Sequence, residues 1–112
     1  MELTSHQSGA LHVVTVKSSR IDAAVAIEFK DAMRVQSDND FAEIVLDLSL
    51  VEFIDSSGLG AIVASMKSIG PDRTLILAGL TPNVEKVFRL TRMDSVFSVF
   101  PSLERALEAH AA

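Results

Sequence analysis

The sequence predicts an α/β fold, a mostly parallel central β-sheet with about four helices packed against it. β-rich and helix-patterned segments alternate along the chain, which implies right-handed crossovers between parallel strands. The chain has 112 residues, of which 48 % are hydrophobic, and this is one domain's worth with enough apolar side chains to bury a core. Single glycines and prolines fall where the elements are expected to end.

The first third of the chain is expected to form two strands and a helix. Residues 3–7 predict a weak edge strand, or an N-terminal segment that is partly mobile. Residues 11–16, LHVVTV, predict a β-strand because branched side chains favour the extended backbone. Asp22 is interpreted as the N-cap of an amphipathic helix over residues 22–37, since apolar side chains follow it at helical spacing.

The middle third contains the strongest strand signal. Residues 43–48, EIVLDL, are almost continuously apolar, which is typical of a strand buried on both faces. A short segment through residue 54 leads to a turn at residues 55–58 and a helix over residues 57–69. We expect its inward stripe to consist of Leu59, Ile62, Val63 and Met66.

The last third repeats the alternation. Residues 73–78 predict another buried strand, and Thr81 is interpreted as the N-cap of a third helix that starts with Pro82. Residues 96–100 predict a final short strand. Ser102 is expected to cap a terminal helix that ends near residue 109.

Composition excludes several classes of function. A net charge of −5 argues against general binding of nucleic acid or of anionic membrane surfaces. The chain has no cysteine, so it has no disulfide, no cysteine nucleophile and no thiolate metal site. The sequence has neither the pattern of a signal peptide nor an apolar stretch approaching about 20 residues, so we expect a cytoplasmic protein without direct membrane insertion.

The turn at residues 55–58 is the strongest candidate site. Ser56 follows a predicted strand and opens a predicted helix, at the sheet edge where functional sites of such folds usually lie. The unpaired amides and positive dipole of a helix start favour a phosphate there. We interpret Gly58 and Gly60 as leaving room for another protein's active site to reach the serine hydroxyl.

Two carboxylates are expected beside this serine. Asp55 precedes it, and Asp22 is expected at a neighbouring helix start, so an added phosphate would change the local potential sharply. From spacing alone, a structural interpretation in which Ser56 and Ser57 merely cap the helix explains the pattern equally well.

Other chemistries have weaker support. A metal site built from Asp22, Asp47 and Asp55 matches no known loop spacing, so neither a metal nor another cofactor is predicted. A hydrolase would need a base for Ser56, but no nucleophile-elbow motif occurs and the histidines are scattered, as expected of surface residues. A nucleotide-binding loop would need a further glycine or a lysine after Gly58-Leu59-Gly60.

The segments IVLDL at residues 44–48 and VEFIDSSGLGA at residues 51–61 closely resemble the signature of the STAS domain, in particular that of the anti-sigma factor antagonists. The resemblance continues through LILAGLTP at residues 75–82, residues 84–90, Asp94 and residues 102–107. It covers nearly the whole chain from residue 11. It implies a single STAS domain over residues 1–112, and a cytoplasmic, bacterial regulator of transcription that is not an enzyme.

The resemblance also implies a mechanism. In that family a serine at the position of Ser56 is phosphorylated by a kinase that is also the anti-sigma factor. The unphosphorylated antagonist binds this kinase and frees its target, and a PP2C-type phosphatase reverses the modification. The resemblance implies that Asp22 lies near the phosphosite and contributes to kinase binding. The residues expected to bind the partner or to surround the phosphate are Asp22, Asp55, Ser57, Gly58 and Leu59.

The sequence departs from the family pattern at two places. Arg20 is a cation where an acidic residue is common, and Arg92-Met93 replaces a usual Gly-Leu pair. Two alternative functions stay open. One is a partner switch for a target outside sigma-factor control, such as a secretion, biofilm or stress regulator. The other is a STAS subunit of a membrane transport complex, although such domains commonly lack the phosphorylatable serine.

Overall fold

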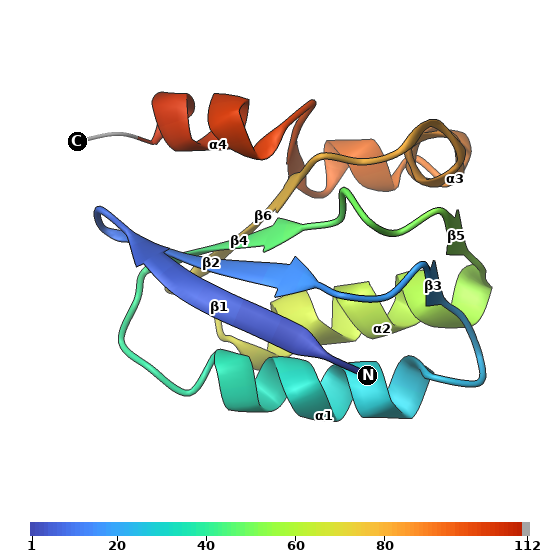
Figure 1. Cartoon of the computed structure of the whole chain (residues 1–112), viewed down its shortest axis with the longest axis horizontal. Coiled ribbons are helices and arrows are strands. Elements are labelled where there is room, and N and C mark those ends of the chain that lie inside the picture. Colours follow the sequence, from blue (N-terminus) through green and yellow to red (C-terminus); the bar gives the residue numbers. More distant parts are fainter. Residues whose placement is uncertain (111–112) are drawn as a thin grey trace.

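A computed structural model, which describes residues 1–110, shows a five-stranded sheet with helices on both faces (Figure 1). The strands lie in the order β1-β2-β4-β6-β7, with β1 antiparallel to β2 and every other neighbouring pair parallel. Their bounds are β1 Leu3–Ser8, β2 Leu11–Val16, β4 Glu43–Asp47, β6 Thr74–Ala78 and β7 Ser98–Phe100. The predicted α/β class with a mostly parallel sheet is confirmed.

Four helices surround the sheet, as the alternation predicts. Their bounds are α1 Ala26–Gln36, α2 Ser56–Ser68, α3 Pro82–Leu90 and α4 Leu103–Ala109. Helices α1 and α2 pack side by side on one face, and α4 covers the opposite face over β4, β6 and β7 (Figure 1). Residues 1–110 also contain three short elements, namely β3 Arg20–Ile21, β5 Phe53–Ile54 and the 3₁₀ turn η1 Met93–Ser95. Helix α3 packs against β5 and η1.

The core lies on both faces of the sheet because successive strand side chains point in opposite directions. Toward α1 and α2, Val14, Leu46 and Leu77 are buried with Phe29 of α1 and Ile62 of α2. The smaller cluster toward α4 consists of Leu11, Val13, Val45, Ile76, Ala78 and Ala106. Strand β4 is therefore buried on both faces, as its apolar run predicts.

The prediction that Asp22 caps α1 is wrong. The helix begins at Ala26, with Val25 as N-cap, and residues 23–25 form a turn before it. The Asp22 carboxylate instead accepts the backbone N–H of Ala24 at 3.2 Å and forms an ion pair with Arg20. A local turn of this kind competes with helix capping for the same side-chain oxygen.

Two other elements differ in detail from the expectation. Thr81 is the N-cap residue of α3 and Pro82 follows it, as predicted, but the Thr81 hydroxyl makes no capping hydrogen bond. It donates instead to the carbonyl of Val51 at 2.6 Å, which ties α3 to the connection between β4 and β5. Of the inward stripe expected for α2, only Ile62 is fully buried. The buried face of α2 is made by Gly58, Ala61, Ile62 and Ser65, because small residues let this helix approach its neighbours closely.

Candidate functional site

Ser56 is the first residue of α2 and is exposed, directly after β5. The N-cap of the helix is Asp55, whose Oδ1 accepts the backbone N–H of Gly58 at 2.9 Å. The interpretation that Ser56 and Ser57 are the caps is therefore wrong. Within residues 1–110, neither serine hydroxyl makes a hydrogen bond. Both residues are exposed.

Asp55 joins two segments with its two carboxylate oxygens. While Oδ1 caps α2, Oδ2 accepts the backbone N–H of Ala23 at 3.1 Å from the loop before α1. The N–H donated by Gly58 lowers the pKa of the Asp55 carboxyl, partial burial opposes this, and the N–H of Ala23 lowers it further. Asp55 is thus an anion that holds the loop against the start of α2.

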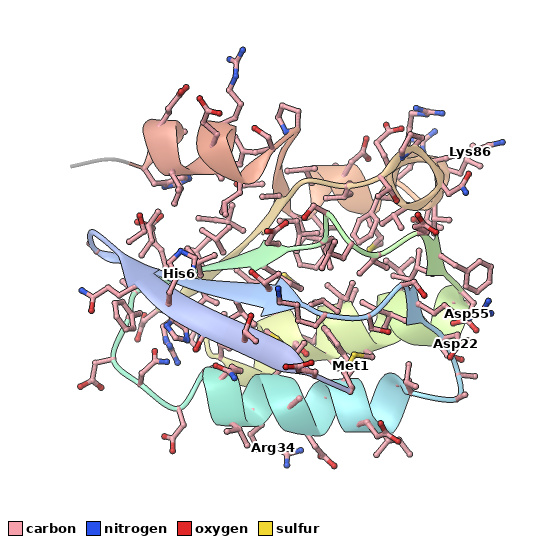
Figure 2. All side chains as sticks on the ribbon, viewed as in Figure 1. Met1, His6, Asp22, Arg34, Asp55 and Lys86 are labelled. Atoms are coloured by element: carbon pink, nitrogen blue, oxygen red, sulfur yellow. The ribbon has the colours of Figure 1, made fainter. Side chains whose placement is uncertain are left out.

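Asp22 and Asp55 lie at neighbouring positions, although not because both start a helix. Strands β3 and β5 run parallel with Ile21 opposite Ile54, so Asp22 and Asp55 follow them at neighbouring positions. Figure 2 shows both side chains at the same edge of the molecule. The proximity of the two aspartates therefore depends on a separate two-stranded ribbon, formed by β3 and β5.

Arg20 and Phe53 form the outer part of the same ribbon. They are register partners, and the Arg20 guanidinium lies over the Phe53 ring with 4.5 Å between Cζ and the ring centroid. The Arg20 Nε also donates to the Asp22 Oδ2 at 3.0 Å. This cluster is not predictable from the sequence pattern, since strands of two residues leave no periodicity to detect.

The two glycines of the turn have different roles. A Cβ on Gly58 would lie 1.9 Å from the backbone oxygen of Ile21, whereas a Cβ on Gly60 would meet no atom within 4 Å. Gly58 is buried, so its missing side chain lets β3 pack on α2 and does not open the site. Only Gly60 fits the expected role of leaving space. Leu59 is half-buried and packs against the core.

The remaining acidic candidate lies elsewhere. Asp47 is buried at the end of β4, where its Oδ1 accepts the backbone N–H of Ser49 at 3.0 Å. It therefore orients the turn after β4. Among residues 1–110, no three histidine, aspartate or glutamate side chains are grouped so that they could hold a metal ion.

The histidines have structural environments. His6 is exposed, but His12 is half-buried and stacks on Phe41 with 5.0 Å between ring centroids. His110 is half-buried, with its Nδ1 2.8 Å from the Glu43 Oε2. None of the three belongs to a group that could hold a metal ion among residues 1–110, and His12 and His110 stay partly exposed. No helix within residues 1–110 has the length and apolarity needed to cross a bilayer.

Comparison with known proteins assigns this architecture to a family. The sequence profile of the STAS domain matches residues 3–106. The chain belongs to the STAS domain family. Within the family it belongs with the anti-sigma factor antagonists, which are regulators and not enzymes. Its relatives include a Bordetella bronchiseptica protein that is named BtrV and placed among these antagonists, 30 % identical over 80 % of this chain and 78 % of that protein.

Two further matches support the assignment. The anti-sigma-B factor antagonist of Listeria monocytogenes is 28 % identical over 79 % of this chain and 78 % of its own length. The crystal structure of an anti-sigma factor antagonist from Mycobacterium paratuberculosis superposes with a TM-score of 0.85 and 28 % identity. That match covers 96 % of this STAS domain and 92 % of the mycobacterial chain.

Proposed function

We propose that the chain is a cytoplasmic partner switch in a bacterial cell, controlled by phosphorylation of Ser56. The unphosphorylated form binds an anti-sigma factor that is also a serine kinase, and this frees the kinase's target. A phosphate on Ser56 blocks the binding, and a PP2C-type phosphatase restores it. The observation that carries the proposal is the exposed Ser56 hydroxyl at the start of α2, in a chain of this family.

The modification is an ordinary phosphoryl transfer. The serine Oγ forms a bond to the γ-phosphorus of ATP, the bond from that phosphorus to ADP breaks, and the hydroxyl proton leaves. The phosphatase adds water across the new bond and returns the hydroxyl and inorganic phosphate. Neither step requires a catalytic group from the STAS domain, so an exposed hydroxyl without a hydrogen bond is sufficient for it to serve as the substrate.

The surroundings of Ser56 explain why a phosphate would act at the surface without unfolding the domain. The first amides of a helix have no intrahelical partner, so the N–H of Ser56 remains available to phosphate oxygens. The phosphate adds about −1.5 to −2 charges beside Asp22 and Asp55. Covering such a charge with a partner protein is costly unless the partner supplies cations, and binding is therefore lost.

The same surface offers contacts to a partner when Ser56 is unmodified. Phe53 is 42 % exposed, and Ile27 lies exposed near the start of α1. Asp22 contributes a carboxylate at this surface, while Asp55 and Gly58 hold the loop and α2 in place from beneath it. Aromatic and aliphatic side chains rimmed by charges are typical of protein interfaces.

Phosphorylation by the cognate kinase, captured from the cells of origin, tests the proposal. With ATP, the kinase is expected to add one phosphate to the wild type and to Ser57→Ala, and none to Ser56→Ala. Ser57→Ala is the matched control because it removes the adjacent exposed hydroxyl. Label that persists undiminished in Ser56→Ala would refute the assignment of the phosphosite.

Binding of the same kinase tests the electrostatic part of the proposal. Ser56→Asp and Ser56→Glu each supply a single negative charge, so we expect them to weaken binding partially. Titration calorimetry that gives the wild type and both variants equal affinity would contradict an electrostatic mechanism. The identity of the target that the kinase releases separates control of a sigma factor from control of a secretion, biofilm or stress regulator.

A further inference from the structure

We propose that Arg20 is an internal ligand for the phosphate on Ser56. This inference rests on the proposed function, because it concerns the modified form of the same site. In the unmodified chain the Arg20 guanidinium is held between the Phe53 ring and the Asp22 carboxylate. After modification it would donate to the phosphate from the same position on the ring.

The ribbon formed by β3 and β5 places Arg20 on the strand beside the one that leads into Ser56. Arg20 is paired with Phe53, which lies three residues before Ser56. Its ion-pair partner Asp22 precedes Ala23, whose N–H is bound to Asp55 at 3.1 Å. The loop that carries the cation is thus fastened to the residue directly before Ser56.

Arg20 also has unused donors. A guanidinium has five N–H groups, and within residues 1–110 only Nε makes a hydrogen bond, to Asp22. The side chain is 59 % exposed. Arginine binds phosphate through two parallel N–H bonds, and a guanidinium already stacked on an aromatic ring loses less freedom when it does so.

A cation such as Arg20 would stabilise a phosphate on Ser56 against the nearby carboxylates. Asp22 and Asp55 both lie beside it, and like charges in proximity raise the cost of the phosphate dianion. The first turn of α2 contributes no acidic side chain, so the carboxylates at its start are those of its N-cap Asp55 and of Asp22 after β3. Arg20 would offset their effect and fix the phosphate against the ribbon.

The test uses the full chain with phosphoserine incorporated at position 56 during translation, so that no kinase is needed. Phosphorus NMR across the pH range measures the second pKa of the phosphate, which is near 6 for free phosphoserine. We expect this pKa to be lower by at least about 0.5 unit in the wild type than in Arg20→Gln. Arg34→Gln is the matched control, because Arg34 is likewise exposed and ion-paired but lies in the last turn of α1.

Arg20→Lys separates charge from geometry. It keeps the cation but loses the two-pronged donor, so its phosphate pKa is expected between those of the wild type and Arg20→Gln. It also serves as the second test should Arg20→Gln fold poorly. Equal phosphate pKa values in the wild type, Arg20→Gln and Arg20→Lys would overturn the inference. That result would leave the proposed function intact, whereas a kinase that fails to modify Ser56 would refute the function and not this contact.

Discussion

Replacing Gly58 with alanine is a direct test of how the site is built. The added Cβ would lie 1.9 Å from the Ile21 backbone oxygen, 2.7 Å from the Ile21 carbonyl carbon and 3.0 Å from the Ile54 Cγ1. Contacts below 3.0 Å essentially do not occur for real Cβ atoms, so β3 and α2 would have to separate by more than about 1 Å. The first of these contacts is to backbone, which cannot rotate away as a side chain can.

The expected change in stability is the balance of two effects. Alanine is a better helix former than glycine by about 1 kcal/mol, which favours the variant. Overpacking costs about 1–3 kcal/mol, and displacement of β3 also strains the hydrogen bond from Ala23 to Asp55. We expect a net loss of about 2 kcal/mol, which lowers the melting temperature of a domain of this size by roughly 10 °C.

Gly60→Ala is the matched control, two residues further along the same helix. A Cβ there would meet nothing within 4 Å, so only the helix propensity changes and the variant should gain up to about 1 kcal/mol. Urea unfolding followed by circular dichroism measures both variants against the wild type. If both gained the same stability, the close approach of Ile21 to Gly58 would be absent and the reasoning would be refuted.

Two further substitutions test other parts of the fold. The lowered pKa of Asp55 means that its carboxylate stabilises the folded state above its unfolded pKa near 4, and that this is lost as pH falls through the folded value. Urea unfolding at pH 3 to 7 should therefore show that Asp55→Asn is less stable than the wild type at neutral pH, and that this difference shrinks in acid. A difference in unfolding free energy that stays the same across the pH range would contradict this. Arg73 donates at 2.7–2.9 Å to Phe41, Ser37 and Asn39. Thermal melting should show Arg73→Ala less stable by about 2 kcal/mol, against less than about 0.5 kcal/mol for the exposed Arg89→Ala, and equal losses would argue against a structural role for Arg73.

The sequence predicts the sheet well because long apolar runs leave few alternatives. EIVLDL at residues 43–48 is buried on both faces, and residues 11–16 form the strand expected from their valines. The terminal helix begins at Leu103 with the Ser102 hydroxyl accepting the N–H of Arg105, which is the cap that its sequence predicts. These features depend on local patterns that no distant residue disturbs.

The details of the site depend on contacts that local patterns do not contain. Asp22 has the residue type of a helix cap, but its oxygens are taken by Ala24 and Arg20. Gly58 has the residue type of an open turn, but the reason for glycine is an oxygen of Ile21 that is far away in the sequence. Both depend on the pairing of β3 with β5, and two-residue strands are invisible to periodicity. The position of Ser56 follows from the sequence, whereas the structure beneath it does not.

One binding measurement tests the central claim most directly. The affinity of the cognate kinase is measured for two forms of this chain that differ only by a phosphate on Ser56. Loss of at least about 100-fold in affinity on phosphorylation is predicted, because the partner would have to cover the added negative charge beside Asp22 and Asp55. Equal affinity of the two forms would mean that this serine does not govern docking, and the switch would have to be abandoned.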